Sequence, residues 1–413
     1  MAAINLDSSV NEKKTKLPFT GMLNGLRGFF ALCVFCIHME NGRYLCNYSG
    51  LKMQAVVLCF FVISSFLLTF SCLSWQPSMT RWRFRLDRNF FSFWGGYFIR
   101  RFSKIYPLFM LIVSIACLNR TASESFFQLV KFWDHALFLR GLSIFWTITI
   151  EWDFYLILPL IIIPYRWAEE LDVKKGNFRR RGVVLLFFWS ISLYITFFQS
   201  IQSYRYLYYH ILPYFPIFWI GSFGAIVYRE ALRRNLIQNV NMEDDVIRKF
   251  GRISLNISFF ANLFCWTSLA ALFFTQPYFL VKFGFELGTG HPDILYRNYV
   301  GTKSAYICTA VVISMISFVR RRSFNTFFEW SFFVFLGKIS YPFYLVHLIC
   351  IHSISKYTAL QGFDGLFVIF GCAIVTSYIL HVIIEEPFIK LGQHLVKGIQ
   401  VKYKKLSNNS SEV

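Results

Sequence analysis

The chain has 413 residues, of which 56% are hydrophobic, 20% aromatic and only 15% charged. Soluble proteins average about 25% charged residues, so the composition argues against an ordinary soluble enzyme. The net charge of +20 suits either a nucleic-acid-binding protein or a membrane protein with basic cytoplasmic loops. Because long apolar stretches separate the basic residues, we expect a lipid bilayer as a partner and no nucleic acid.

Apolar stretches of bilayer length recur along the whole chain. A membrane-spanning helix needs about 20 mostly apolar residues. We predict ten spans, and therefore an all-α, polytopic bundle that is integral to a membrane. The spans cover about 21–39, 54–74, 105–118, 143–163, 182–200, 207–228, 253–274, 303–319, 333–353 and 365–384. The Phe-, Trp- and Gly-rich stretch 89–99 is a candidate interfacial segment before the third span.

The distribution of basic residues predicts the orientation. With the N-terminus in the cytoplasm, 30 of the 42 Lys and Arg residues fall in cytoplasmic segments and 10 on the other side. Basic residues concentrate in cytoplasmic loops of membrane proteins, so both termini are predicted to be cytoplasmic. The expected parts are a tail at 1–20 without secretory-signal features, a membrane domain at 21–390 and a second tail at 391–413.

The ten cysteines do not indicate a disulfide framework, because all except Cys46 lie in apolar segments. Cys33 and Cys36 form a CxxC inside such a segment, without a second pair, and we interpret them as small apolar filler. No spacing of His, Cys or carboxylate residues predicts a metal site.

Two ionisable residues lie in the first span. Arg27 and His38 are 11 residues apart, which is close to three helical turns, so both lie on one face about 16 Å apart along the axis. Ionisable residues in a membrane helix suggest a functional site. The alternative is a snorkelling Arg near the cytoplasmic end and an interfacial His near the outer end.

Two further polar residues lie within predicted spans. Glu151 is about eight residues from the outer end of its span, too deep to reach water, and should be protonated or paired with a His or Arg of another helix. Such a pair could be purely structural. Ser64, in the second span, could bond a ligand, but helix packing is the favoured interpretation.

Basic residues precede the third span, and polar residues recur in the ninth. Arg100, Arg101 and Lys104 have helical spacing and could bind a phosphorylated ligand, although an ordinary cytoplasmic flank explains them as well. In the ninth span, His347 is expected at a depth similar to that of His38, and His352 lies off that face. Together these clusters suit either group transfer from a phosphorylated donor or a proton-coupled transporter.

Several motifs, in order along the chain, resemble acyltransferase family 3, the integral-membrane O-acyltransferases. They comprise Arg27 and His38 with Gly28 and Ala31, FFVISSFLL at 60–68, Arg100, Arg101, Lys104, Tyr106 and Pro107, then Trp146, Glu151, Phe154, Tyr155, Leu156 and Pro159, and finally Leu336-Gly337, Tyr341, Tyr344, Leu345 and His347, followed by Glu386-Pro387. The resemblance extends over about 21–390. Ser65 in place of Gly, and Trp152-Asp153 in place of Glu-Gln, depart from the family pattern.

The resemblance implies transfer of an acyl group, most often acetyl, from acyl-CoA to a hydroxyl of a carbohydrate, a lipid or a small metabolite. Acyl-CoA (acetyl-CoA) would be a co-substrate, with no permanently bound cofactor. His38 would be catalytic, Arg27 would position the donor, and Glu151 would support the acceptor or the histidine. The residues expected on the donor side are Arg100, Arg101, Lys104, Tyr106 and Ser64.

The chemistry agrees with these roles. A hydroxyl that attacks a thioester needs a general base, and His is the usual choice. Ser64 and Tyr341 are candidate donors to the oxyanion, and His347 completes the predicted pocket. A transporter and a catalytically inactive scaffold stay open as alternatives.

Overall fold

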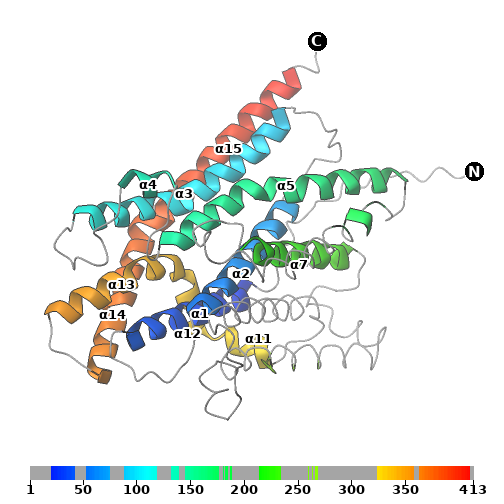
Figure 1. Cartoon of the computed structure of the whole chain (residues 1–413). Helices are drawn as coiled ribbons and strands as arrows, with labels where there is room; N and C mark the ends of the chain where they lie inside the picture. The colour runs from blue at the N-terminus through cyan, green and yellow to red at the C-terminus, as the bar shows by residue number, and fades with distance from the viewer. Residues whose placement is uncertain are drawn as a thin grey trace, which may run out of the picture.

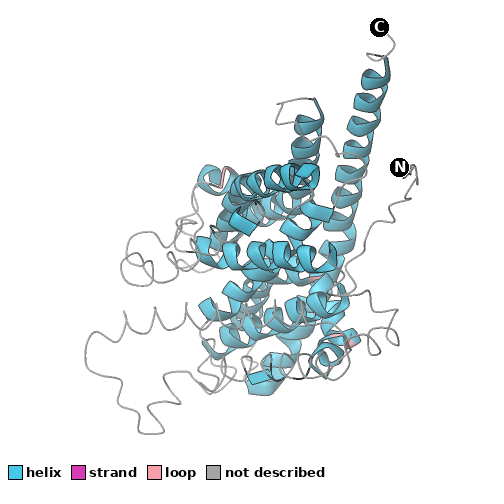
Figure 2. Cartoon of the chain, turned by 90° about the vertical axis from the view of Figure 1, so that its right-hand side faces the viewer, coloured by secondary structure: helices cyan, strands magenta, loops and turns pink. Residues whose placement is uncertain are grey.

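The part of the chain described by the computed structural model is helical. The described residues are 20–41, 53–74, 88–118, 132–138, 145–175, 214–233, 323–357 and 362–409, with a few positions between 180 and 267. Figure 2 shows helices and no strand among them. The all-α prediction is therefore confirmed for these segments.

The helices are labelled in Figure 1. In chain order they are α1 (Thr20–Asn41), α2 (Met53–Ser74), α3 (Arg88–Leu118), α4 (Phe132–Ala136), α5 (Trp146–Lys175), α7 (Phe215–Arg233), α11 (Ser323–Phe328), α12 (Ser331–Lys338), α13 (Ser340–Tyr357), α14 (Gly362–Leu380) and α15 (Glu386–Asn409), with a π-helical turn, η2 (His381–Glu385), between the last two.

Within the described residues, four helical segments are long and apolar enough to cross a membrane. They are Gly21–Met39, Val56–Ser74, Trp146–Glu169 and Gly362–Val401, and α12 with α13 makes a fifth if the bent pair counts as one span. These segments indicate an integral membrane protein. The predicted spans 182–200, 253–274 and 303–319 lie outside the described residues apart from isolated positions. The count of ten spans and the cytoplasmic termini stay predictions.

The described helices differ from the predicted spans mainly at their ends. α3 begins at Arg88, so the stretch 89–99 is part of the N-terminal portion of one continuous helix and not a separate segment. α5 continues past 163 to Lys175, and most of the predicted tail 391–413 is the helical end of α15. Apolarity marks the part of a helix that suits a bilayer, so it does not reveal the polar extension beyond it.

The span predicted at 333–353 is broken in the structure. α12 and α13 meet at Ile339 with a bend of 80°. The Ser340 hydroxyl donates to the Gly337 carbonyl across the break, at 2.9 Å. Pro342 lies in the first turn of α13, where a missing backbone N–H costs little. The bend lets α13 run in a new direction and carry His347 toward α1.

Glycines allow α1 and α12 to touch backbone to backbone. A Cβ atom on Gly28 would collide with the carbonyl oxygen of Phe333, and one on Gly337 with the carbonyl oxygen of Asn24. Small residues at a helix crossing allow this close approach, which is common in membrane bundles. The contact holds α1, with both of its predicted site residues, against the bent pair.

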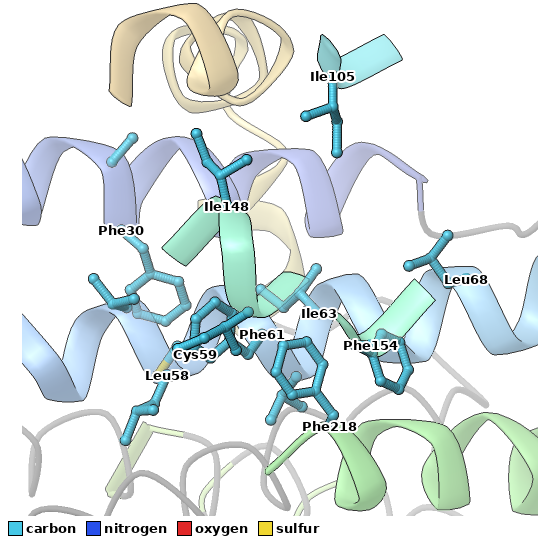
Figure 3. Close-up of a cluster of buried hydrophobic side chains, with 14 of the residues drawn as sticks. Phe30, Leu58, Cys59, Phe61, Ile63, Leu68, Ile105, Ile148, Phe154 and Phe218 are labelled. Atoms are coloured by element: carbon cyan, nitrogen blue, oxygen red, sulfur yellow. The ribbon is translucent and has the colours of Figure 1, made fainter. Parts of the chain in front are cut away.

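Aromatic rings join α2, α5 and α7. The Phe218 ring of α7 stacks on Phe61 of α2 with centroids 4.7 Å apart, and on Phe154 of α5 with centroids 4.5 Å apart. All three side chains are buried, and Figure 3 shows them in the apolar cluster. The hydroxyl of Thr69 adds a hydrogen bond of 2.9 Å to Ser222 between α2 and α7. This packing fixes the helix that carries Glu151.

A buried ionic group fastens one end of the same three helices. Arg166 of α5 donates to the carbonyl oxygen of Leu73, near the end of α2. Arg166 and Arg229 of α7 both pair with Glu169, at 2.7 Å and 3.1 Å. The Glu169 carboxylate thus pairs with an arginine of α5 and an arginine of α7. Because Arg166 also bonds a carbonyl near the end of α2, the group connects all three helices.

The C-terminal helices form one long unit. α14 continues through η2 into α15, and α15 packs along α3, so that both extend to the upper right in Figure 1. The buried residues of α14 recur every fourth position, as Gly365, Ile369, Ala373 and Ser377. Many of the large apolar side chains on the rest of α14 are exposed, among them Phe363, Phe367 and Val375, as expected of a helix that faces lipid. None of the seven described cysteines forms a disulfide.

Candidate active site

Two histidines predicted from distant parts of the sequence meet in the structure. The rings of His38 on α1 and His347 on α13 have centroids 5.0 Å apart. His347 is almost completely buried. The Nε2 atom of each ring is buried and has no hydrogen-bond partner. Two imidazole nitrogens are therefore available in an otherwise apolar setting.

Backbone carbonyls fix the tautomer of His347. Its Nδ1 atom lies 2.7 Å from the Tyr344 carbonyl oxygen and 3.2 Å from that of Phe343. Carbonyl oxygens only accept hydrogen bonds, so Nδ1 carries a hydrogen. A neutral ring of this tautomer has its lone pair on Nε2, the atom without a partner. The arrangement leaves His347 Nε2 able to accept a proton or a hydrogen bond.

A third histidine lies on the same helix as His347. His352, predicted to lie off the face of His347, acts electrostatically on His38. Its Nδ1 atom lies 3.1 Å from the Leu348 carbonyl oxygen. Among the described residues, no group of three or more His, Cys, Asp or Glu side chains is arranged to hold a metal ion.

Charged side chains from four elements gather around Lys104. Lys104 of α3 lies within electrostatic range of two cations, Arg27 and Arg101, and of two carboxylates, Glu151 and Glu385. The Nε atoms of Arg27 and Arg101 are buried without a hydrogen-bond partner. Arginine presents several donors in a planar fork that matches phosphate oxygens. The cluster is therefore suited to a phosphorylated ligand.

Glu151 forms a side-chain hydrogen bond with a tyrosine of its own helix. Its carboxylate accepts a hydrogen bond from the Tyr155 hydroxyl, one turn along α5. Arg101 also acts electrostatically on Tyr155, and the Tyr97 hydroxyl lies 3.5 Å from the Tyr155 carbonyl oxygen. Glu151 thus belongs with Arg101 and Lys104. The structure does not place it against His38.

Two of the predicted hydroxyl donors have different surroundings. The Tyr341 hydroxyl donates to the carbonyl oxygen of Ile105 at 2.7 Å, which ties α13 to α3. It must leave that carbonyl before it can bond an oxyanion. Ser64 is partly buried, whereas its neighbour Ser65 is fully buried and donates to the Val62 carbonyl oxygen.

The predicted donor-side residues of α3 do not all share one face. Arg101 and Lys104 are three residues apart and lie on the same side of the helix. Tyr106 lies on the opposite side. The centroid of its ring is 4.3 Å from that of Phe102, on which it stacks, and 5.9 Å from that of Phe138. Arg100 lies near Arg101 and Tyr97. The structure therefore separates Tyr106 from the cationic group.

Sequence reasoning missed Glu385 and His381. Glu385 is only 3% exposed, and one of its carboxylate oxygens lies 2.7 Å from His381 Nδ1. The adjacent Glu386-Pro387 belongs to the late motif in the sequence. The motif does not show that the residue before this pair ends a π-helical turn and is buried.

A third missed residue is His135 in α4. Its side chain is fully buried against the ring of Phe145, and neither ring nitrogen has a hydrogen-bond partner. Burial lowers the pKa of His135 below its ordinary value. The next turn ends at Phe138, whose φ of 56° is unusual for a bulky residue.

The site therefore has two polar groups joined by α1. Arg27 and His38 are separated by about 16 Å along the helix axis. The cations and the histidines thus lie near opposite ends of the same helix. Proton transfer and anion binding are the two operations that these groups support.

Comparison with known proteins identifies the family. The sequence profile described as "Acyltransferase domain", that of acyltransferase family 3, matches residues 21–386. A curated protein of Acidianus two-tailed virus, named provisionally as an acetyltransferase, is 23% identical over 273 residues, which cover 64% of this chain and 67% of the relative. No solved structure matches the chain. Since the match extends over most of the sequence, the protein belongs to acyltransferase family 3 and is an integral-membrane enzyme that transfers acyl groups other than aminoacyl groups.

Proposed function

We propose that the enzyme transfers an acyl group, acetyl in the simplest case, from acyl-CoA to a hydroxyl, with His38 as the general base. The observation that carries this proposal is the His38–His347 pair, with two buried Nε2 atoms that lack partners. Histidine is the usual base for a hydroxyl attacking an acyl carbon, since its pKa lies near neutrality. An imidazole with an unoccupied lone pair is ready for that task.

The reaction balances without a metal or a redox partner. His38 takes the proton of the acceptor hydroxyl while the oxygen of that hydroxyl forms a bond to the thioester carbon. The carbon–sulfur bond breaks, and the proton passes to the CoA sulfur. The same residues allow an acyl-histidine intermediate, in which His38 first takes the acyl group from the thioester and then yields it to the acceptor.

The cationic group is the proposed site for the phosphates of the donor. Arg101 and Lys104 lie on one face of α3, with Arg27 nearby and Arg100 beside them. The chain between the phosphates and the sulfur of CoA has about a dozen bonds and extends on the order of 15 Å. That length is similar to the separation of Arg27 and His38 along α1, about 16 Å.

The acceptor is proposed from the family alone. A carbohydrate, a lipid or another small hydroxyl compound would approach the histidine end of α1. In the predicted multi-pass orientation, the donor enters from the cytoplasm and the acceptor from the other side. The family assignment favours this enzymatic function over the transporter that the same polar residues suggested.

The experiment uses the purified full-length protein in detergent, acetyl-CoA labelled in the acetyl group, and a panel of hydroxyl acceptors. We expect labelled product with the wild type and a loss of about 100-fold or more in His38→Ala. His394→Ala is the control, because that histidine is exposed on α15. Undiminished transfer by His38→Ala refutes the assignment of the base. Solute uptake into vesicles without consumption of acetyl-CoA refutes the proposed reaction.

A further inference from the structure

Glu385 is a buried carboxylate that the reaction described so far does not use. It lies at the last position of the π-helical turn η2, is 3% exposed, and bonds His381 at 2.7 Å. Its neighbour Glu386 behaves differently. That carboxylate is 43% exposed and forms an ordinary helix-surface pair with Lys390, four residues on. Two adjacent acidic residues thus have opposite environments.

The π-helical turn has a local cause. Pro387 has no backbone N–H, and in a regular α-helix its ring would clash with the carbonyl of Ile383. Widening the preceding turn relieves that clash, and such π-bulges are frequent at functional sites. Because the wider turn shifts the helix face by a fraction of a turn, Glu385 is directed inward and Glu386 outward.

The inward side of η2 faces the cationic group. η2 packs against α3, and the carboxylate of Glu385 acts electrostatically on Lys104 and on Tyr341. Arg27, Arg101 and Glu151 act on the same Lys104. Three cations held together in a partly buried region repel one another, and interactions between charges are stronger there than in water. Glu385 and Glu151 offset that repulsion.

We propose that Glu385, held in place by His381, is a positioning residue that keeps Lys104 charged and directed toward the phosphates of the donor. This inference rests on the proposed function, because it assumes that the cationic group binds acyl-CoA. Glu385 itself does not touch the donor and takes no part in proton transfer. It therefore controls how tightly CoA binds, and leaves the chemical step at the histidines unchanged.

A binding measurement tests this role. Full-length variants are purified in detergent, and the Kd for tritiated CoA is measured, with the thermal midpoint of unfolding as a check on folding. Loss of one partly buried counter-charge costs about 1 kcal/mol, so Glu385→Gln is expected to weaken CoA binding about 5–10-fold. Glu386→Gln is the matched control, with a Kd within twofold of wild type. Glu385→Asp keeps the charge and should recover part of the affinity.

A double-mutant cycle shows whether Glu385 acts through Lys104. In a Lys104→Met background, adding Glu385→Gln should change the Kd by less than twofold. An equal loss in both backgrounds overturns the proposal. If Glu385→Gln fails to fold, His381→Leu supplies the second variant, because it leaves the carboxylate in the chain but removes its support. An unchanged Kd in that variant also overturns the proposal.

The outcomes separate the two proposals. If wild type binds no CoA, the proposed function fails. If wild type binds CoA and Glu385→Gln binds it equally well, only the role of Glu385 fails. Where acetyl transfer is measurable, Glu385→Gln should raise the KM for acetyl-CoA while kcat stays within about twofold. A merely structural glutamate would lower kcat and thermal stability together.

Discussion

The two ends of α1 differ in the environment of their polar side chains. At one end, His38 and His347 sit among apolar side chains with unpartnered Nε2 atoms. At the other, Arg27 belongs to a group in which cations and carboxylates offset one another. A base must keep its lone pair unoccupied until the substrate arrives, whereas an anion site must hold like charges together before its ligand binds. The difference in environment thus corresponds to a difference in task.

The same contrast separates the two histidines. His347 is nearly fully buried, and its Nδ1 atom is bonded to backbone carbonyls of its own helix. His38 is partly buried and belongs to a different helix. A ring fixed by its own backbone is suited to orienting a neighbour. His347 is therefore expected to support His38, the proposed base.

The largest expected effect follows from replacing His347. Asn at this position keeps a donor for the backbone carbonyls but has no group at the place of Nε2, so His347→Asn should lower kcat about 100-fold. The KM for acetyl-CoA should stay unchanged, because the cationic group is intact. His347→Gln places an amide near Nε2 and should retain more activity. Steady-state kinetics with labelled acetyl-CoA distinguishes them, and full activity in His347→Asn would remove His347 from the reaction.

The sequence predicted more of the histidine end than of the cationic end. Arg27 and His38 share a helix, so their spacing alone defined their relative positions. The late motif added His347 at a similar depth, and the structure brings the two rings together. The resemblance to a known family supplied the roles, which the physical pattern alone left open between an enzyme and a transporter.

The cationic end depends on features that the sequence analysis did not predict. Glu385 is buried at the end of a π-helical turn, and Glu151 forms a side-chain hydrogen bond with Tyr155 on its own helix. Helical spacing would have separated Tyr106 from Lys104, but the family motif had grouped them. The sequence analysis also did not predict the bend at Ile339, although Gly337, Lys338, Ser340 and Pro342 interrupt the apolar run there.

A helix crossing supports the cationic end, and Gly28→Ala should weaken it. The added Cβ would meet the carbonyl oxygen of Phe333, a backbone atom that has little room to move. Overpacking of this kind costs about 1–3 kcal/mol. The expected result is a lower midpoint of thermal unfolding in detergent. Gly371→Ala is the matched control, since its Cβ would meet nothing within 4 Å. Equal midpoints for both variants would show that α1 and α12 are not in close contact.

Removing one cation should weaken the binding of the acyl-CoA donor and leave the chemical step unchanged. Arg101→Met eliminates a guanidinium whose buried Nε lacks a partner. One lost charged hydrogen bond to phosphate corresponds to a KM for acetyl-CoA raised about tenfold, with kcat nearly unchanged. Lys390→Met, on the exposed surface of α15, should leave both constants unchanged. A large fall in kcat with constant KM would place Arg101 at the acyl group and erase the division between the two ends.

The smallest expected effect concerns His135, a third histidine environment outside the two ends. Because burial lowers its pKa in the folded protein, the unfolded chain binds more protons below its ordinary pKa, about 6.5. His135 therefore costs stability as the pH falls. Replacing it with Leu removes a buried polar group without a partner, which should raise the free energy of unfolding by about 1 kcal/mol. The midpoint of thermal unfolding should rise in His135→Leu, more at pH 5.5 than at pH 8, and stay constant in His394→Leu. If His135→Leu instead folds normally but loses acyl transfer, the imidazole contacts a substrate, and the enzyme has a third functional region.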